Sequence, residues 1–201
     1  MKSQTTSPAF SICVYCGSKP GNKPEFAQIA VQVGTWIGTH GGQLVYGGGR
    51  NGLMGLVAEA TMAAGGTVIG IIPTALVEKE WAHHGCTELH VVDTMHERKR
   101  LMADKADAFL ALPGGIGTFE ELFEIWAWRH LGYHNKPFGI LNCQGYYDDL
   151  MKFLAHCQDQ QFVSQKQNEF LQYGDDAHQL LSQLISQAGL AGNDPQLAKI
   201  I

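Results

Sequence analysis

Residues 108–126 read AFLALPGGIGTFEELFEIW, and this stretch decides the fold. The apolar run 108–112 predicts a buried strand, and the pattern from Leu122 onward is typical of a helix. A glycine-rich loop joins the two. Such a junction leaves the first N–H groups of the helix without backbone partners at the sheet edge, where they suit a phosphate group. We therefore expect a phosphorylated ligand at this loop.

The carboxylate of Glu121 has two interpretations. Thr118 and Glu121 have the spacing of a capping box, in which the hydroxyl and the carboxylate bond to backbone N–H groups at the helix start. Alternatively, Glu121 takes part in catalysis, because charge repulsion makes a carboxylate unfavourable beside a simple phosphate site. The motif alone leaves both interpretations open.

Apolar runs of strand length recur along the chain, mostly separated by segments with helical periodicity. Runs that are apolar throughout indicate strands covered on both faces, as in a parallel sheet with helices on each side. The sequence thus predicts a doubly wound, Rossmann-like α/β fold. The expected strands are 12–16, 43–46, 67–72, 89–92, 108–112 and 138–142, and the expected helices are 25–39, 53–64, 95–106, 119–131, 146–160 and 175–187.

A chain of 201 residues, 45% of them hydrophobic, can bury one good core. We expect a flexible N-terminus over residues 1–10, a single nucleotide-binding catalytic domain over 11–187 and a tail over 188–201. No repeat or linker argues for a second domain.

The 14 basic and 19 acidic residues give a net charge of −5, which would repel a nucleic acid. No run approaches the ~18 apolar residues that span a bilayer. The N-terminus also lacks the long apolar stretch of a signal peptide. We expect a cytoplasmic protein with neither nucleic acid nor membrane as partner.

Cysteine and histidine patterns predict neither a redox centre nor a metal site. Cys13 and Cys16 have the redox spacing, but residues three apart on a strand face opposite sides. No HExxH motif and no Cys/His pairing at metal-ligand spacing is present. We therefore expect no metal and no cofactor.

In an open parallel sheet, ligands bind beyond the carboxyl ends of the strands. That rule selects four loops, at residues 17–18, 47–49, 73–74 and 114–118. Three of them are rich in glycine, which lets backbone approach a ligand closely.

Residues 47–52 formally match the GxGxxG fingerprint of dinucleotide-binding proteins. That fingerprint requires an acidic residue about 20 positions on, at the end of the next strand, to bind the ribose. Here the next strand ends in Pro73. The glycines are better explained by a mononucleotide and by tight packing.

The basic run 95–100, MHERKR, begins a predicted helix. Cations there oppose the helix dipole unless an anion compensates. The alternative is a solvated basic face paired with Glu97 and Asp104. Arg98 and Lys99 point about 100° apart on a helix, so both could reach one ligand while Arg100 turns away.

Three motifs occur together: GGGRNGLMG at 47–55, MHERK at 95–99 and PGGIGTFEE at 113–121. In order and spacing they resemble the signature of the LONELY GUY family, cytokinin riboside 5′-monophosphate phosphoribohydrolases that are often mislabelled as lysine decarboxylases. The similarity extends from about residue 11 to residue 162.

The resemblance implies hydrolysis of the N-glycosidic bond of a nucleoside 5′-monophosphate, giving free base and ribose 5-phosphate, by a homodimer. It implies catalytic roles for Arg98 and Glu121. Together with the loops at the strand ends, it predicts a set of substrate-binding residues: Glu80, Lys99, Gly114, Gly115, Ile116, Gly117, Thr118, Phe119, Glu120, Gly17, Ser18, Gly47, Gly48, Gly49 and Met95.

One departure and two rival functions remain. Plant members often carry a threonine substrate contact where this chain has Ala127, so the preference for isopentenyl-adenine nucleotides over AMP stays open. A pyridoxal phosphate decarboxylase needs a Schiff-base lysine, and no lysine here has a recognisable setting for one. A nucleotide or oxyanion carrier on the same scaffold is the stronger alternative.

Overall fold

The computed structural model describes residues 7–79 and 81–190. Strands and helices alternate along most of this chain. The strands are β1 (Ser11–Tyr15), β2 (Gln43–Tyr46), β3 (Thr67–Pro73), β4 (Glu88–Val92), β5 (Ala108–Ala111), β6 (Phe138–Leu141) and β7 (Leu171–Gly174). The helices are α1 (Pro24–Thr39), α2 (Gly52–Ala63), α3 (Thr74–Val77), α4 (Met95–Lys105), α5 (Ile116–His130), the 3-10 turn η1 (Cys143–Gly145), α6 (Asp148–Asp159), α7 (Gln165–Glu169) and α8 (Ala177–Gln187).

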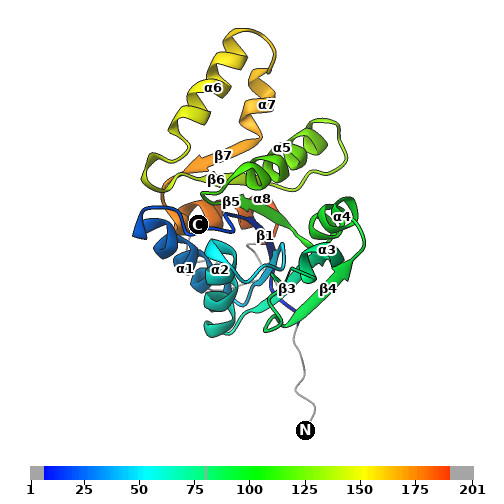
Figure 1. The fold of residues 1–201 in the computed structure, drawn as a ribbon. Helices are drawn as coiled ribbons and strands as arrows, with labels where there is room; N and C mark the ends of the chain where they lie inside the picture. Colours follow the sequence, from blue (N-terminus) through cyan, green and yellow to red (C-terminus); the bar gives the residue numbers. More distant parts are fainter. Residues whose placement is uncertain (1–6, 80, 191–201) are drawn as a thin grey trace.

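The strands form one parallel sheet in the order β4-β3-β2-β1-β5-β6-β7 (Figure 1). The chain starts in the middle, builds outward to β4 and returns to place β5 beside β1. In register, Ile12 lies between Leu44 of β2 and Ala108 of β5. This order confirms the predicted doubly wound fold. The order of the strands reverses between β1 and β5, and sheets of this type bind ligands at such a point.

Helices cover both faces of the sheet and create two apolar cores. Helices α1, α2 and α8 pack on one face, and α4, α5 and α6 pack on the other. In β1, Ile12 and Val14 point into the first core, as does Cys16 directly after the strand, whereas Cys13 and Tyr15 point into the second. The alternation explains why the run is apolar throughout.

Cys13 of β1 and Cys16 directly after it therefore face opposite sides of the sheet, as predicted. Both are free thiols and buried. Burial raises the pKa of Cys13 and of Cys16 well above the ordinary thiol value. Because the thiolate is the reactive form, neither residue is suited to redox chemistry.

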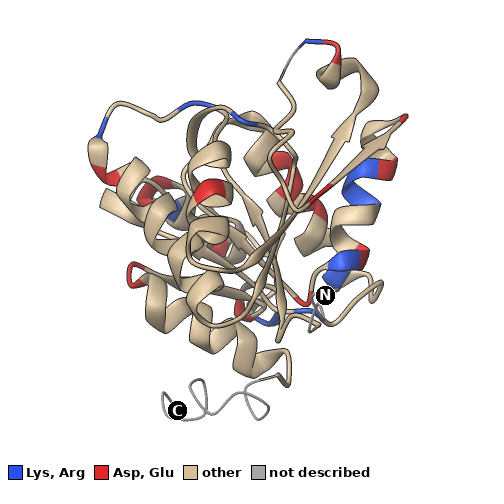
Figure 2. Ribbon diagram, turned by 90° about the horizontal axis from the view of Figure 1, so that it is seen from below, with Lys and Arg blue, Asp and Glu red and all other residues tan. Residues whose placement is uncertain are grey.

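The sheet itself contains almost no charged residues. Apart from Glu88 at the start of β4, the strands contain no Lys, Arg, Asp or Glu. The other coloured residues in Figure 2 accordingly lie on helices and loops. An ion pair buried near the sheet is thus an exception that requires an explanation.

Some elements differ from the sequence prediction. Strand β7 was missed because only its first residue, Leu171, is buried, so no apolar run marks this edge strand. The short helices α3 and α7 were also missed. Helix α5 begins at Ile116 and not at residue 119, so the last glycine of the motif, Gly117, belongs to the first turn of the helix. Helices α6 and α7 project from the body of the molecule near β7 (Figure 1).

The predicted terminal segments extend into residues 1–6 and 191–201, outside the described part of the chain. Within the described part, Phe10 is buried and packs against Trp36, with ring centroids 5.6 Å apart. Leu190 contacts the same core. No helix of residues 7–79 or 81–190 combines the length and apolarity needed to cross a membrane.

Candidate functional site

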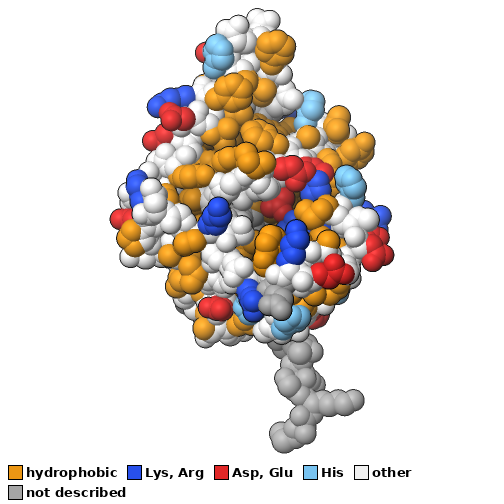
Figure 3. Space-filling model, viewed as in Figure 1, with side chains coloured by type: hydrophobic (Ala, Val, Ile, Leu, Met, Phe, Trp, Pro, Cys, Tyr) orange, Lys and Arg blue, Asp and Glu red, His pale blue; other side chains and the backbone are white. Residues whose placement is uncertain are grey.

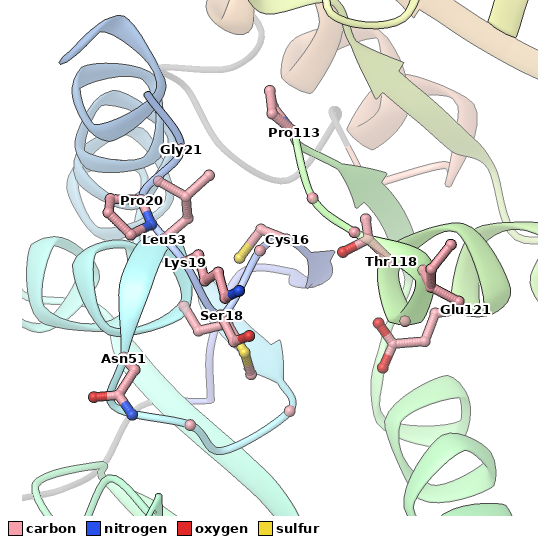
Figure 4. Close-up of a pocket in the computed structure, with 18 of the residues that line it drawn as sticks. Cys16, Ser18, Lys19, Pro20, Gly21, Asn51, Leu53, Pro113, Thr118 and Glu121 are labelled. Carbon is pink, nitrogen blue, oxygen red and sulfur yellow. The ribbon is translucent and has the colours of Figure 1, made fainter. Parts of the chain in front are cut away.

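A cavity of about 510 Å³ opens at the carboxyl ends of β1, β2, β3 and β5. Figure 3 shows the surface hollowed between α2 and α5, with acidic and basic side chains side by side at the margin. In Figure 4 the loops after β1 and β2 form one wall, and Pro113, Thr118 and Glu121 form the opposite wall. The cavity thus lies over the crevice between β1 and β5, with loops on both sides of it.

A buried ion pair forms part of this cavity. Arg98 of α4 donates from Nη1 to Oε1 of Glu121 of α5 at 2.8 Å, and from Nε to the carbonyl of Ile71 at 3.2 Å. The side chains are 9% and 10% exposed. The predicted solvated basic face is therefore wrong for Arg98, whose charge is compensated by Glu121 and directed at the cavity.

Gly47 makes this position of Arg98 possible. A Cβ atom at Gly47 would lie 1.9 Å from Arg98 Nη2, closer than any non-bonded contact allows. Arg98 Nη2 has no hydrogen-bond acceptor within residues 7–79 and 81–190. The first glycine of the GxGxxG pattern thus provides space for a guanidinium that keeps a free donor toward the cavity.

The ionisation of Glu121 is shifted by its surroundings. Burial raises the pKa of its carboxyl above the ordinary value, and the charge and hydrogen bond of Arg98 oppose that shift. A carboxyl held in this balance can change its proton occupancy closer to neutral pH than an exposed one. Such groups are suited to acid–base work or to charge stabilisation.

The start of α5 forms the opposite wall. Its N-cap is Gly115, which makes no side-chain cap bond, and the first turn contains no acidic residue. In the described chain, the N–H groups of Ile116, Gly117 and Thr118 donate to no acceptor outside the helix. These donors and the positive end of the helix dipole face the cavity and suit a phosphate.

The capping-box interpretation of Glu121 is wrong. Thr118 lies inside the first turn of α5 and not at its N-cap, since the helix begins at Ile116. The carboxylate of Glu121 bonds to Arg98 instead of to the helix start. A true capping box occurs elsewhere, between Thr94 and Glu97 at the start of α4.

The glycine loop before α5 is fixed by its neighbours. The hydroxyl of Tyr146 donates to the carbonyl of Gly114. The hydroxyl of Tyr147 donates to the carbonyl of Leu112 at 2.7 Å. From the other side, the N–H of Gly17 donates to the carbonyl of Pro113 at 3.0 Å. The backbone donors at the start of α5 are therefore held in place before any ligand arrives.

Lys99 does not face the cavity. Its ammonium group donates to Glu120 at 2.5 Å and to Glu124 at 2.9 Å, and its side chain is 10% exposed. Burial lowers its pKa, but the hydrogen bonds and charges of the two carboxylates outweigh burial and raise the pKa above the ordinary value. Lys99 thus connects α4 to α5, whereas Arg100 is exposed and lies 3.9 Å from Asp104, as a solvated basic face predicts.

The remaining wall is apolar. It is formed by Leu53 and Met54 of α2, Ile72 of β3, Leu76 of α3 and Trp81. Trp81 is 47% exposed, so one part of its ring is open to a ligand. The backbone N–H of Arg50 donates to the Trp81 carbonyl at 2.9 Å, which ties this segment to the loop after β2.

The structure brings most of the predicted site residues together. Those that line the cavity are Gly17, Ser18, Gly47, Gly49, Arg98, Gly114, Gly115, Ile116, Gly117, Thr118 and Glu121. Those that do not line it are Gly48, Met95, Lys99, Phe119 and Glu120. Glu80 lies outside the described residues, and Ala127 occupies an exposed position on α5 away from the cavity.

Sequence reasoning missed several lining residues, among them Lys19, Asn51, Leu76, Trp81 and Tyr146. The rule of strand ends could have predicted Lys19 and Leu76, because each lies only a few residues beyond a selected loop. Trp81 and Tyr146 carry no comparable signal, since nothing in the sequence distinguishes them from other surface aromatic residues. Among the described residues, no group of three or more His, Cys, Asp or Glu side chains could hold a metal ion.

Solved structures of similar fold exist. The molybdenum cofactor binding protein of the phototrophic bacterium Rippkaea orientalis matches with a TM-score of 0.68 at 20% identity, covering 91% of this chain and 98% of that protein. The Moco carrier protein of Chlamydomonas reinhardtii matches with a TM-score of 0.68 at 20% identity, covering 92% and 99%. At this identity the likeness shows the shared fold alone.

Sequence comparisons are more specific. A family model described as "Possible lysine decarboxylase" matches residues 54–184. A cytokinin riboside 5′-monophosphate phosphoribohydrolase of Rhodococcoides fascians is 49% identical over 155 residues, 77% of this chain and 78% of the relative. One of Arabidopsis thaliana is 43% identical over 181 residues, 90% and 83% of the two chains. This chain therefore belongs to the LONELY GUY family of cytokinin riboside 5′-monophosphate phosphoribohydrolases, the family that its three motifs predicted.

Proposed function

We propose that this protein hydrolyses the N-glycosidic bond of nucleoside 5′-monophosphates and releases the free base and ribose 5-phosphate. The observation that carries the proposal is the buried pair Arg98–Glu121, placed on one cavity with the open N-terminus of α5. The names of the relatives, phosphoribohydrolases at 43% to 49% identity, support the same reaction.

The phosphate would bind at the first turn of α5. The free N–H groups of Ile116, Gly117 and Thr118 and the dipole behind them are complementary to a dianion. At Gly115 and Gly117, the position that a Cβ atom would occupy has no neighbouring atom within 4 Å, so a ligand can approach this backbone closely.

The base would lie against the apolar wall. Trp81 offers an aromatic face, and Met54 and Leu76 offer polarisable and aliphatic surface. A volume of about 510 Å³ is within the range of small-molecule sites and can hold a mononucleotide. The ribose would then lie between the two walls, beside Glu121.

Cleavage of an N-glycosidic bond passes through an oxocarbenium-like state, in which positive charge grows on the ribose and negative charge grows on the departing base. Glu121 would stabilise the ribose cation and orient the attacking water. Arg98 holds the carboxylate in place, and its free Nη2 donor would support charge development in the transition state. Water adds to C1′, the bond to the base breaks, and the proton released by water leaves with the base.

The decarboxylase function has less support. A Schiff-base lysine must lose its proton easily, for example through a pKa lowered by burial. Lys99, the buried lysine of this region, is instead held by two carboxylates that raise its pKa. Its ammonium is committed to α5 and does not line the cavity.

We also propose that the protein acts as a homodimer. The supporting observation is apolar surface on and after α5, where Phe123 is 40%, Leu131 is 62% and Tyr133 is 74% exposed. Exposed apolar side chains on and directly after one helix are candidates for contact with a second copy of the chain.

The proposed reaction is tested by incubating the purified protein with AMP and with isopentenyl-adenosine 5′-monophosphate and measuring free base by chromatography. We expect release by the wild type and a loss of kcat of about 10²- to 10⁴-fold in Glu121→Ala. Glu169→Ala is the matched control, because Glu169 is exposed on α7, makes no ion pair among the described residues and does not line the cavity. Unchanged kcat in Glu121→Ala would exclude the proposed role, and tight binding of either nucleotide without release would favour the carrier alternative.

A further inference from the structure

Lys19 lines the cavity from the loop between β1 and α1, next to Ser18. Figure 4 shows it on the wall opposite Thr118. The two cationic side chains that line the cavity in the described chain are Lys19 and Arg98, and the one acidic side chain is Glu121. The two cations therefore differ in whether the one carboxylate of the cavity wall compensates them.

Arg98 is already compensated and Lys19 is not. Arg98 is committed to Glu121 at 2.8 Å. Among residues 7–79 and 81–190, no carboxylate lies within ion-pair distance of the Lys19 ammonium. The cavity as a whole thus has one uncompensated positive charge, and the dipole of α5 adds to it.

The backbone that carries Lys19 is held on two sides. Gly17 donates to the carbonyl of Pro113, and its own carbonyl accepts from the N–H of Leu53 at 3.0 Å. On the α2 side, a Cβ atom at Gly52 would lie 2.4 Å from the backbone nitrogen of Lys19, so the two segments are in van der Waals contact. Gly52 has a φ of +60°, a conformation that glycine adopts without strain. The loop is thus packed between the starts of α2 and α5.

We infer that Lys19 binds the phosphate group of the nucleotide, reaching it from the wall opposite the first turn of α5. This inference rests on the proposed function, because it assigns a second ligand to the phosphate of the same substrate. The helix start supplies backbone donors and a partial charge, and Lys19 supplies a full charge. The other cations near the site, Lys23, Arg50 and Lys79, do not line the cavity.

A contact to the phosphate is the same in the ground state and in the transition state, since the phosphate does not react. Losing such a contact raises KM and leaves kcat nearly unchanged. It also reduces the preference for a nucleotide over the corresponding nucleoside. Loss of Glu121, in contrast, lowers kcat.

The test compares Lys19→Gln and Lys19→Arg with Lys23→Gln, a matched control from the same exposed loop region. The KM and kcat for AMP are measured, and the binding of ribose 5-phosphate and of ribose is measured by calorimetry in low salt. We expect KM and the ribose 5-phosphate Kd to rise about three- to tenfold in Lys19→Gln. Lys19→Arg retains most of the affinity, and Lys23→Gln has the KM and Kd of the wild type. The difference in Kd between Lys19→Gln and the wild type becomes smaller in high salt.

Calorimetry separates this inference from the proposed reaction. Release of base by the wild type, with equal KM and Kd in Lys19→Gln and Lys23→Gln, would overturn the role of Lys19 and leave the reaction standing. Absence of base release, with ribose 5-phosphate still bound more weakly by Lys19→Gln alone, would overturn the reaction and support Lys19 as a phosphate ligand. Absence of both release and ribose 5-phosphate binding would overturn both.

Discussion

The two glycine-rich loops of the cavity wall have similar sequences and different tasks. The β2–α2 loop begins GGGRNG at residue 47, and the β5–α5 loop reads PGGIG from residue 113. In the first, glycines provide room: Gly47 for the guanidinium of Arg98 and Gly52 for the backbone of Lys19. In the second, a Cβ atom added at Gly115 or Gly117 would have no neighbouring atom within 4 Å, and the backbone donors there are open to the cavity. Glycines at a strand end therefore serve a binding site in two ways: they make room for a neighbouring chain segment or side chain, or they let a ligand approach backbone donors.

The largest effect that this comparison predicts concerns Gly47. We expect Gly47→Ala to displace Arg98 and to lower kcat/KM about 100-fold, the typical cost of losing one preorganised donor. Gly49→Ala in the same loop meets only the flexible end of Met54 at 3.2 Å and should change kcat/KM by less than about threefold. Steady-state kinetics on both variants, with thermal melts to verify folding, would check this. Equal losses would show that the first loop binds substrate itself.

The glycines of the second motif differ in the space around them. A Cβ atom at Gly114 would lie 2.1 Å from Thr118 Oγ1 and 2.9 Å from the nitrogen of Gly17, whereas one at Gly117 meets nothing. We expect Gly114→Ala to destabilise the fold by about 1–3 kcal/mol, the usual range for overpacking. Gly117→Ala should leave stability intact and raise the KM for AMP, since the methyl group occupies the phosphate approach. Urea unfolding and kinetics distinguish the two, and destabilisation by Gly117→Ala would contradict this difference.

The smallest effect is a shift on the pH axis. If ionised Glu121 is the active form, kcat/KM falls as pH is lowered through its pKa, because protonation removes the negative charge that stabilises the ribose cation. Burial places that pKa above the ordinary value of 4.5, and Arg98 holds it down. In Gly47→Ala, where Arg98 is displaced, the acidic limb of the profile should move to higher pH. If the acidic limb lies at the same pH in the wild type and in Gly47→Ala, then Gly47 does not influence the pKa of Glu121 through Arg98.

The sequence predicts most of the fold because strands buried on both faces require apolar residues throughout, and such apolar runs can be recognised in a sequence. In β1, five successive apolar or small residues indicate a strand covered on both faces, and the structure has this arrangement. Strand β7 is half solvated at the edge of the sheet and leaves no such pattern. The start of α5 was displaced by three residues because Gly115 ends the loop without a side-chain cap, so the Thr118–Glu121 spacing looked like the true cap.

The site is predictable to a smaller extent. The rule of strand ends selects Gly17, Ser18 and the two glycine loops, and all of these residues except Gly48 line the cavity. It does not tell Arg98 from Lys99, because both are buried and both bind carboxylates of α5. Only the relative rotation of α4 and α5 decides which cation faces the ligand, and that rotation depends on tertiary packing.

The order of the strands has a consequence for how the protein folds. Strand β1 is complete at Tyr15, but its neighbour β5 begins at Ala108, so the central pair of the sheet closes a long loop. Contacts so far apart in sequence form slowly and late. During synthesis, the first half of the sheet can assemble while the phosphate donors of α5 and the carboxylate of Glu121 are still absent. Recovery of catalytic activity on refolding should therefore lag behind recovery of helical signal and report the closure of β1 on β5.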